Sequence, residues 1–375
     1  MGQTGSIFRL NKMPPMRAAP RLACASACLL AIAVPASGCG GDSGSTDSTA
    51  TAATVAASRP APPESAFPSA EGRSLRQVLK VGEGPAEVRF EPAAMVFYKG
   101  RNRYPFGVVE HDGTPVGDAE VALYLAKAPR PKPGSKSKSG NKGQLAKAEA
   151  QALDEPAIGP FPAAIETLAT KPAFRAKTTA EDPDSATVVY SAQIDFPSDG
   201  EWRIAALVRE DGEIKGKPLP SARVGEFSSI PRPGQPAPRI HTPTAADVGG
   251  DLSRITTRIP PDTQNEVDYA DALGQEPVML LFATPQFCQS RVCGPVVDVA
   301  EQVKQEYGDK AAFIHMEIYN DNDPGKSVRP QVRAFNLPSE PWLFAIDREG
   351  RVSSAIEGAV GVEGMTAAVK KAVAE

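Results

Sequence analysis

Residues 278–296 read VMLLFATPQFCQSRVCGPV, and this stretch decides how the C-terminal part of the chain folds. The run over residues 278–282 is continuously apolar, which is typical of a central strand buried on both faces. Two cysteines follow, Cys288 and Cys293, separated by four residues. Pro295 suits the first turn of a helix, so the stretch predicts a strand, a cysteine-bearing loop and a helix in that order.

The segments that follow continue this alternation. Apolar residues at helical spacing predict a helix over residues 295–307, ended by Gly308, and a second buried strand over residues 311–319. The other expected elements are helices over 265–274, 328–335 and 364–373, and strands over 342–347 and 352–357. The order β-α-β followed by β-β-α predicts an α/β domain over residues 265–375.

Three motifs of this region resemble the thioredoxin superfamily. The segment LFATP over residues 281–285 looks like the strand that delivers the nucleophilic cysteine, and CGP over 293–295 looks like part of the family's Cys-Gly-Pro-Cys turn. The segment EPWLF over 340–344 looks like the one that bears the family's cis-proline, and IDREGRV over 346–352 looks like its following hairpin. The resemblance implies a thioredoxin-like fold and makes Pro341 the expected cis-proline, facing the active cysteines.

The cysteine spacing departs from the family's usual pair, which has two residues between the cysteines. In one register Cys288 is the nucleophile and Cys293 is its resolving partner. In the other, Cys293 holds the family's nucleophile position and Cys288 attacks it from the loop. We favour the first register, because free N–H groups and the dipole at a helix N-terminus lower a thiol pKa from about 8.5. Arg291 is expected to add positive charge there.

The N-terminus has the features of an export signal. Basic residues precede an apolar run over residues 22–34, which is shorter than the roughly 20 helical residues that a bilayer core requires. The segment ASGCGGDS over residues 36–43 resembles a bacterial lipobox, in which the cysteine receives a lipid before cleavage. The sequence therefore predicts a signal peptide over residues 1–38, a lipid on Cys39 and a position on the extracytoplasmic face of the cell membrane.

The cysteine count gives the remaining pair a function. Of the five cysteines, Cys24 and Cys28 would leave with the signal and Cys39 would carry the lipid, so Cys288 and Cys293 remain. A bridge between residues so close in sequence closes a very short loop and constrains the unfolded chain little. We therefore expect this pair to serve redox chemistry rather than to stabilise the fold as a structural disulfide.

Residues 76–228 follow a different pattern, in which short alternating segments are separated by turn signals such as Asp112-Gly113. Short strands at this spacing predict an all-β sandwich. The stretch resembles the immunoglobulin-like domains of exported bacterial proteins at residues 106–109 (FGVV), 117–121 (GDAEV) and 200–203 (GEWR). The expected fold is thus multidomain, an all-β immunoglobulin-like sandwich followed by an α/β thioredoxin-like domain.

The other segments are predicted linkers. Residues 39–75 are rich in Ser, Thr, Ala and Pro and form the expected lipidated tether. Residues 127–150 form a lysine-rich, disordered insertion in the sandwich, and residues 229–264 form a proline-rich connector expected to run over the next domain. The formal net charge of −4 gives no reason to expect a nucleic-acid partner.

The resemblance implies a membrane-anchored, extracytoplasmic thiol–disulfide oxidoreductase that uses Cys288, Cys293 and Pro341 and needs no cofactor. Its partners would be protein thiols or disulfides, or a membrane electron donor, and the lipid on Cys39 would hold it at the membrane. Whether it oxidises or reduces depends on its reduction potential, which the sequence leaves open.

Three other functions remain open from the sequence. Thr284-Pro285 before Cys-x4-Cys-Gly resembles peroxiredoxins that keep both cysteines at this spacing, which would make the chain a thiol peroxidase. A copper-delivering relative of thioredoxin would add a histidine, for which His315 and His241 are the candidates. A non-catalytic binding or scaffold lipoprotein would use the same pair as a structural disulfide.

Overall fold

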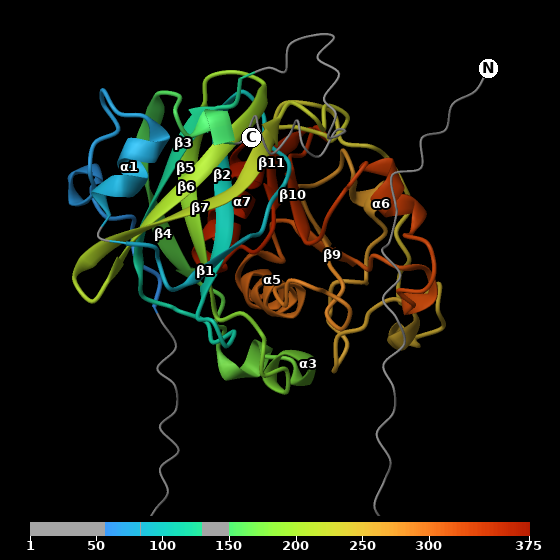
Figure 1. Cartoon of the computed structure of the whole chain (residues 1–375). Helices are drawn as coiled ribbons and strands as arrows, with labels where there is room; N and C mark the ends of the chain where they lie inside the picture. Colours follow the sequence, from blue (N-terminus) through green and yellow to red (C-terminus); the bar gives the residue numbers. More distant parts are fainter. Residues whose placement is uncertain (1–56, 83, 130–149) are drawn as a thin grey trace, which may run out of the picture. The chain divides into compact units, whose positions relative to one another are not determined.

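The computed structural model describes residues 57–82, 84–129 and 150–375. The predicted signal peptide, the predicted lipidation site Cys39 and most of the predicted basic insertion lie outside these residues. Within the described ranges, no helix has the length and apolar character needed to cross a bilayer. From residue 57 onward the chain forms a strand-rich part, the β region (residues 76–228), and then an α/β region (residues 265–375), as Figure 1 shows.

Seven antiparallel strands build the β region in the order β1-β2-β5-β4-β3-β6-β7. The strand β4 pairs with β3 through its first half and with β5 through its second half, so one sheet folds over along β4 around a shared core. The strands are β1 (Arg89–Pro92), β2 (Gly100–Val109), β3 (Glu120–Lys127), β4 (Ala157–Thr167), β5 (Val188–Phe196), β6 (Gly200–Glu210) and β7 (Glu213–Val224).

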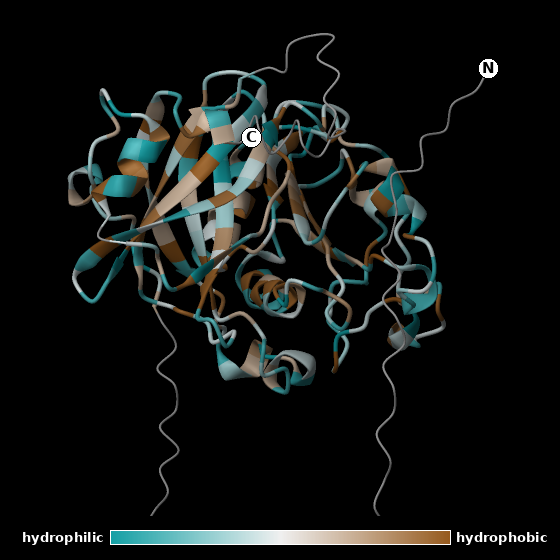
Figure 2. Ribbon diagram, viewed as in Figure 1, coloured by the Kyte–Doolittle hydropathy of each residue, from teal (hydrophilic) through white to brown (hydrophobic). Residues whose placement is uncertain are grey.

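The core of the β region is rich in aromatic rings. Phe97 stacks on Tyr104 with 5.3 Å between ring centroids, and Phe106 stacks on Tyr190 at 5.4 Å. Apolar and polar residues alternate in the second half of β5 (Figure 2), as a strand with one buried face requires, whereas β3 is buried on both faces. The strand-rich character expected for residues 76–228 is therefore present, and the immunoglobulin-like arrangement stays a prediction.

The helix that precedes the strands of the β region packs on the outer face of β3 and β6. The helix α1 (Leu75–Val81) begins at a capping box, in which the Ser74 side chain accepts from the Gln77 N–H and the Gln77 side chain accepts from the Ser74 N–H. It buries Leu75 and Val78 completely. The other segments outside the α/β region are α3 (Lys177–Ala180) and the short turns η1 (Glu64–Ala66), η2 (Pro172–Phe174) and η3 (Leu252–Arg254).

The α/β region contains a four-stranded sheet in the order β11-β10-β8-β9. The strands β8 and β9 are parallel, and the two others are antiparallel to their neighbours. Every residue of β8, β9 and β10 is buried, as the apolar runs predicted. The elements are β8 (Val278–Phe282), α5 (Cys293–Tyr307), β9 (Ala312–Met316), η4 (Asn320–Asn322), α6 (Pro330–Ala334), β10 (Trp342–Ile346), β11 (Val352–Glu357) and α7 (Val362–Ala374).

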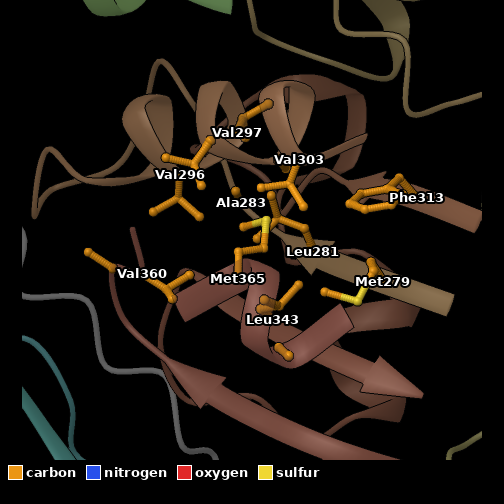
Figure 3. Packing of buried hydrophobic residues seen from close by; sticks show 14 of the residues in the cluster. Met279, Leu281, Ala283, Val296, Val297, Val303, Phe313, Leu343, Val360 and Met365 are labelled. Carbon is orange, nitrogen blue, oxygen red and sulfur yellow. The ribbon is translucent and has the colours of Figure 1, made fainter. Parts of the chain in front are cut away.

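This sheet has an apolar cluster on each face. On one face, Val296 and Val303 of α5 point toward Leu281 of β8 and Met365 of α7 (Figure 3). On the other face, Phe335, next to α6, packs on the rings of β8 and β10. The β-α-β then β-β-α order and the strand order together give a thioredoxin-like domain.

One predicted helix is shorter than expected. The spacing predicts a helix over residues 265–274, but only α4 (Tyr269–Ala272) is helical. The reason is that Asn265 is fixed elsewhere: its side-chain amide donates to the His315 carbonyl of β9 at 2.9 Å, and its own carbonyl accepts from the connector. The helix begins only after Asp268, whose side chain caps it.

The proline-rich connector lies along the edge strand β11. The Gly234 N–H donates to the Val352 carbonyl at 2.8 Å, and the Ala237 N–H donates to the Gly350 carbonyl at 2.9 Å. These bonds satisfy backbone groups that an edge strand otherwise leaves open. The connector therefore runs over the α/β region.

A buried ion pair joins three distant segments. Arg258 of the connector pairs with Asp298 of α5 through Nε and Oδ1 at 2.9 Å, with side chains only 6% and 1% exposed. The Arg258 guanidinium also donates to the carbonyls of Pro260 and Phe174, and Asp298 Oδ2 accepts from the Ala176 N–H. The last two partners lie in the β4–β5 connection (residues 168–187), which is thereby fixed against α5.

We expect the Asp298→Ala substitution to lower the free energy of unfolding by about 3–5 kcal/mol, because it leaves the Arg258 charge buried without its partner. The measurement is the urea midpoint of the soluble chain from residue 57. The double variant Arg258→Met, Asp298→Leu should recover most of the loss, since it removes both charges together. The exposed Arg76–Asp154 pair supplies the control, and Asp154→Ala should leave the midpoint nearly unchanged. An Asp298→Ala variant as stable as the parent would contradict a stabilising role for the Arg258–Asp298 pair.

Candidate active site

The two cysteines lie between β8 and α5, in a loop that makes two successive turns. The Phe287 N–H donates to the Thr284 carbonyl at 3.3 Å, and the Arg291 N–H donates to the Cys288 carbonyl at 3.3 Å. Arg291 adopts a left-handed conformation with φ of 58°, which closes the second turn. We call residues 283–292 the cysteine loop. Because α5 begins at Cys293, Cys288 belongs to the loop and the two sulfurs can meet without distorting a helix.

The first N–H of α5 points at the Cys288 sulfur. The Cys293 N–H donates to Cys288 Sγ at 3.3 Å, and the residue directly before the helix, Val292, supplies no side-chain hydrogen bond. The Ser290 hydroxyl lies 3.3 Å from the same sulfur. Cys288 Sγ therefore occupies the position of a helix cap, where an anion is stabilised by unpaired N–H groups and by the helix dipole.

The surroundings separate the pKa values of the two thiols. A hydrogen bond from the Cys293 thiol, aided by Ser290 and two backbone N–H groups, lowers the pKa of Cys288 to about 6 against the opposing effect of burial. Complete burial, together with the Cys288 charge, raises the pKa of Cys293 well above its usual range. Cys288 is thus the thiolate at neutral pH and Cys293 the proton-bearing partner, which favours the register with Cys288 as nucleophile.

The third predicted site residue, Pro341, begins the segment that leads into β10. The Glu340–Pro341 peptide bond is cis, and the Pro341 carbonyl accepts from the Gly358 N–H at 2.9 Å. Sequence reasoning missed its neighbour Glu340. Burial raises the pKa of Glu340 to about 7, and the charge of Cys288 adds to the rise. The only sequence feature that could have pointed to Glu340 is that it directly precedes Pro341, the expected cis-proline.

Arg291 does not act as predicted. Its guanidinium pairs with Asp182 at 3.2 Å and lies 4.0 Å from Asp184, both in the β4–β5 connection. Its carbonyl accepts from the Ala186 N–H at 3.1 Å. The charge is taken up by these carboxylates, so Arg291 fastens the cysteine loop to the β region rather than stabilising the thiolate. Local sequence gave no signal for this contact, because the partners lie more than 100 residues away.

A buried polar cluster contacts the backbone at the start of the cysteine loop. His315 Nδ1 lies 2.8 Å from Asp262 Oδ2, and its Nε2 lies 3.2 Å from the Ala283 carbonyl. Although burial opposes it, the Asp262 carboxylate raises the pKa of His315 to about 9. Thr257 donates to Glu317 and accepts from the Gln286 N–H at 3.2 Å. These contacts hold both ends of residues 283–286 in place.

The histidines proposed for copper delivery are engaged elsewhere. His315 is held between Asp262 and the loop backbone, and the exposed His241 lies 2.5 Å from Asp268. In the described part of the chain, no three His, Cys, Asp or Glu side chains gather in a group that could hold a metal ion.

No family model matches the chain, and no curated protein matches it. Among solved structures, one match is a thiol:disulfide interchange protein, a thioredoxin family protein from Chlorobium tepidum TLS. It is 20% identical, with a TM-score of 0.27, and the match covers 38% of this chain and 97% of that one. The features that define the thioredoxin-like domain are the strand order of the α/β region and the cysteine loop before α5.

We expect the alkylation rate of the reduced protein by iodoacetamide to rise with pH around a midpoint near 6, because only the Cys288 thiolate reacts and its pKa is about 6. Below that pH the thiol is protonated and the reaction slows. Mass spectrometry at each pH identifies the modified cysteine. Cys288→Ser should abolish the fast phase, whereas Cys293→Ala should keep it with a higher midpoint, since the hydrogen bond from the Cys293 thiol is lost. A midpoint above 8 in the parent protein would refute this assignment.

Proposed function

We propose that this chain is a thiol–disulfide oxidoreductase in which Cys288 is the nucleophile and Cys293 resolves the intermediate. The observation that carries the proposal is the hydrogen bond from the Cys293 N–H, the first N–H of α5, to Cys288 Sγ, beside a Cys293 side chain that is completely buried. The first feature stabilises a charge on Cys288, and the second keeps Cys293 protonated. A structural disulfide requires no such difference between its two sulfurs.

The exchange proceeds in two displacements. The Cys288 thiolate attacks one sulfur of a substrate disulfide, the substrate S–S bond breaks, and the other substrate sulfur leaves as a thiol. Cys293 then loses its proton and attacks Cys288 Sγ in the mixed disulfide. The substrate leaves as its second thiol and the protein keeps an intramolecular disulfide. Two electrons pass from protein to substrate, and the reverse sequence oxidises a substrate dithiol.

The partners follow from this chemistry. Protein thiols or disulfides are the proposed substrates, and a membrane electron donor is the alternative source of reducing equivalents. The peroxidase alternative has less support, because the buried Thr284 hydroxyl makes no hydrogen bond to Cys288 Sγ or to any other group of the described residues. Hydrogen peroxide consumption that is lost in Cys288→Ser would favour it over disulfide exchange.

The decisive test is to trap the mixed disulfide. A full-length Cys293→Ser variant should accumulate a covalent adduct with a disulfide-bearing peptide, because Cys288 attacks and nothing resolves the product. Cys288→Ser should form no adduct, and the parent should release the second peptide thiol. Non-reducing electrophoresis and mass spectrometry identify the species. Equal adduct formation by both variants would leave the pair without a division of roles and would overturn the proposal.

We also propose that this chemistry takes place at the extracytoplasmic face of the cell membrane, through a lipid on Cys39. The support is the lipobox-like segment ASGCGGDS and the absence of acidic residues ahead of it. In a bacterial host, Cys39→Ser should lose metabolic labelling by palmitate and move the protein out of the membrane fraction. Cys28→Ser, changed within the signal itself, is the matched control and should behave as the parent. A labelled, membrane-bound Cys39→Ser variant would disprove the anchor.

A further inference from the structure

A groove with a volume of about 490 Å³ separates the cysteine loop from the outer face of the β region. One wall is the exposed face of β1 and β2, with Arg89 opposite Val109 and Glu91 opposite Gly107. The facing wall is formed by residues 289–292 of the cysteine loop. Two regions that are far apart in the sequence therefore enclose one site, and its size lies in the range of pockets that bind ligands.

The groove borders the loop that carries the nucleophile. Ser290 lines it, and the Ser290 hydroxyl lies 3.3 Å from Cys288 Sγ. The loop wall is fixed in place, because the Arg291 carbonyl accepts from the Ala186 N–H and its guanidinium pairs with Asp182. A chain can therefore bind against residues 289–292 without a rearrangement of this wall, which reduces the entropic cost of binding.

The lining suits an extended polypeptide rather than a charged small molecule. Its charges are paired locally: Arg89 lies 3.7 Å from Glu91, and Arg291 pairs with Asp182. Apart from Asp184, which lies 4.0 Å from Arg291, the other residues that line the groove are neutral, among them Gly107, Val109 and Val292. In addition, β1 is the terminal strand of its sheet, and terminal strands offer backbone donors and acceptors to an extended chain. A peptide backbone matches a surface that combines neutral walls with backbone groups.

We propose that this groove binds the polypeptide segment flanking the reactive cysteine of a substrate protein, so that the β region selects protein disulfides over small ones. This inference rests on the proposed exchange at Cys288 and deepens it. The β region then supplies half of the substrate site.

Gly107 provides a way to fill the groove without moving the loop. A Cβ added there would meet only the Glu91 Cβ, at an ordinary contact distance of 3.8 Å. Gly107→Trp therefore places its ring over β1 within the groove, and Gly107→Ala is the matched control. Glu91→Trp fills the same space from the neighbouring strand at an exposed position.

The test compares two substrates that share a leaving group. One is a ten-residue peptide with a central cysteine joined to thionitrobenzoate, and the other is free cysteine joined to thionitrobenzoate. Release of thionitrobenzoate by the reduced full-length protein gives a second-order rate constant for each. We expect Gly107→Trp and Glu91→Trp to lower the peptide constant at least tenfold and to leave the cysteine constant within twofold of the parent, with Gly107→Ala unchanged for both.

The other outcomes separate the two proposals. If Cys288→Ser still releases thionitrobenzoate at the parental rate, the exchange function itself fails. If Cys288→Ser is inactive but neither tryptophan variant slows the peptide, exchange stands and the groove proposal is overturned. Equal losses for peptide and cysteine would mean that the tryptophans act on the thiol and not on polypeptide binding, and this result also overturns it.

Discussion

The contact between Arg258 and Asp298 is the constraint on which the rest of the architecture depends. Charges buried this deeply are stable only when every partner is in place, because each unpaired ion would bear a large desolvation cost. The partners come from the connector, from α5 and from the β4–β5 connection, so these three segments must dock together. Since α5 begins at Cys293, the same docking fixes the end of the helix on which the cysteines depend.

This arrangement explains how two thiols of one chain come to differ so strongly. The residue directly before helix α5, Val292, supplies no side-chain hydrogen bond, and Cys288 Sγ accepts the first N–H of the helix. The Cys293 sulfur lies inside the apolar cluster between α5 and the sheet, where a second negative charge would be costly. One thiolate stabilised by the other thiol is therefore the favourable state of the pair. The same effect raises the pKa of Glu340: its own burial disfavours the carboxylate, and the negative charge of Cys288 adds to the rise.

The sequence predicted the features that depend on neighbours in the chain. The apolar run over residues 278–282 marked β8, the helical spacing after Pro295 marked α5, and the EPW motif marked the cis bond at Pro341. The features it did not predict depend on distant partners. Asn265 lies outside the expected helix because β9 and the connector bind it, and the carboxylates that hold Arg291 belong to another region. No local pattern encodes such contacts, since each depends on how the two regions dock.

The residues that lengthen the cysteine spacing are also those that contact the β region. The pair here has two more intervening residues than the usual pair of the thioredoxin superfamily. If the helix began directly after Cys288, side chains five positions apart would not face each other. The intervening residues instead form a turn in which Arg291 has a positive φ and reaches Ala186 and Asp182. Ser290 remains beside the sulfur. The longer spacing thus lets one loop hold the nucleophile at the helix end while it contacts the β region. If the groove binds substrate, as we propose, a pair with the usual spacing would have the thiol chemistry but not this contact.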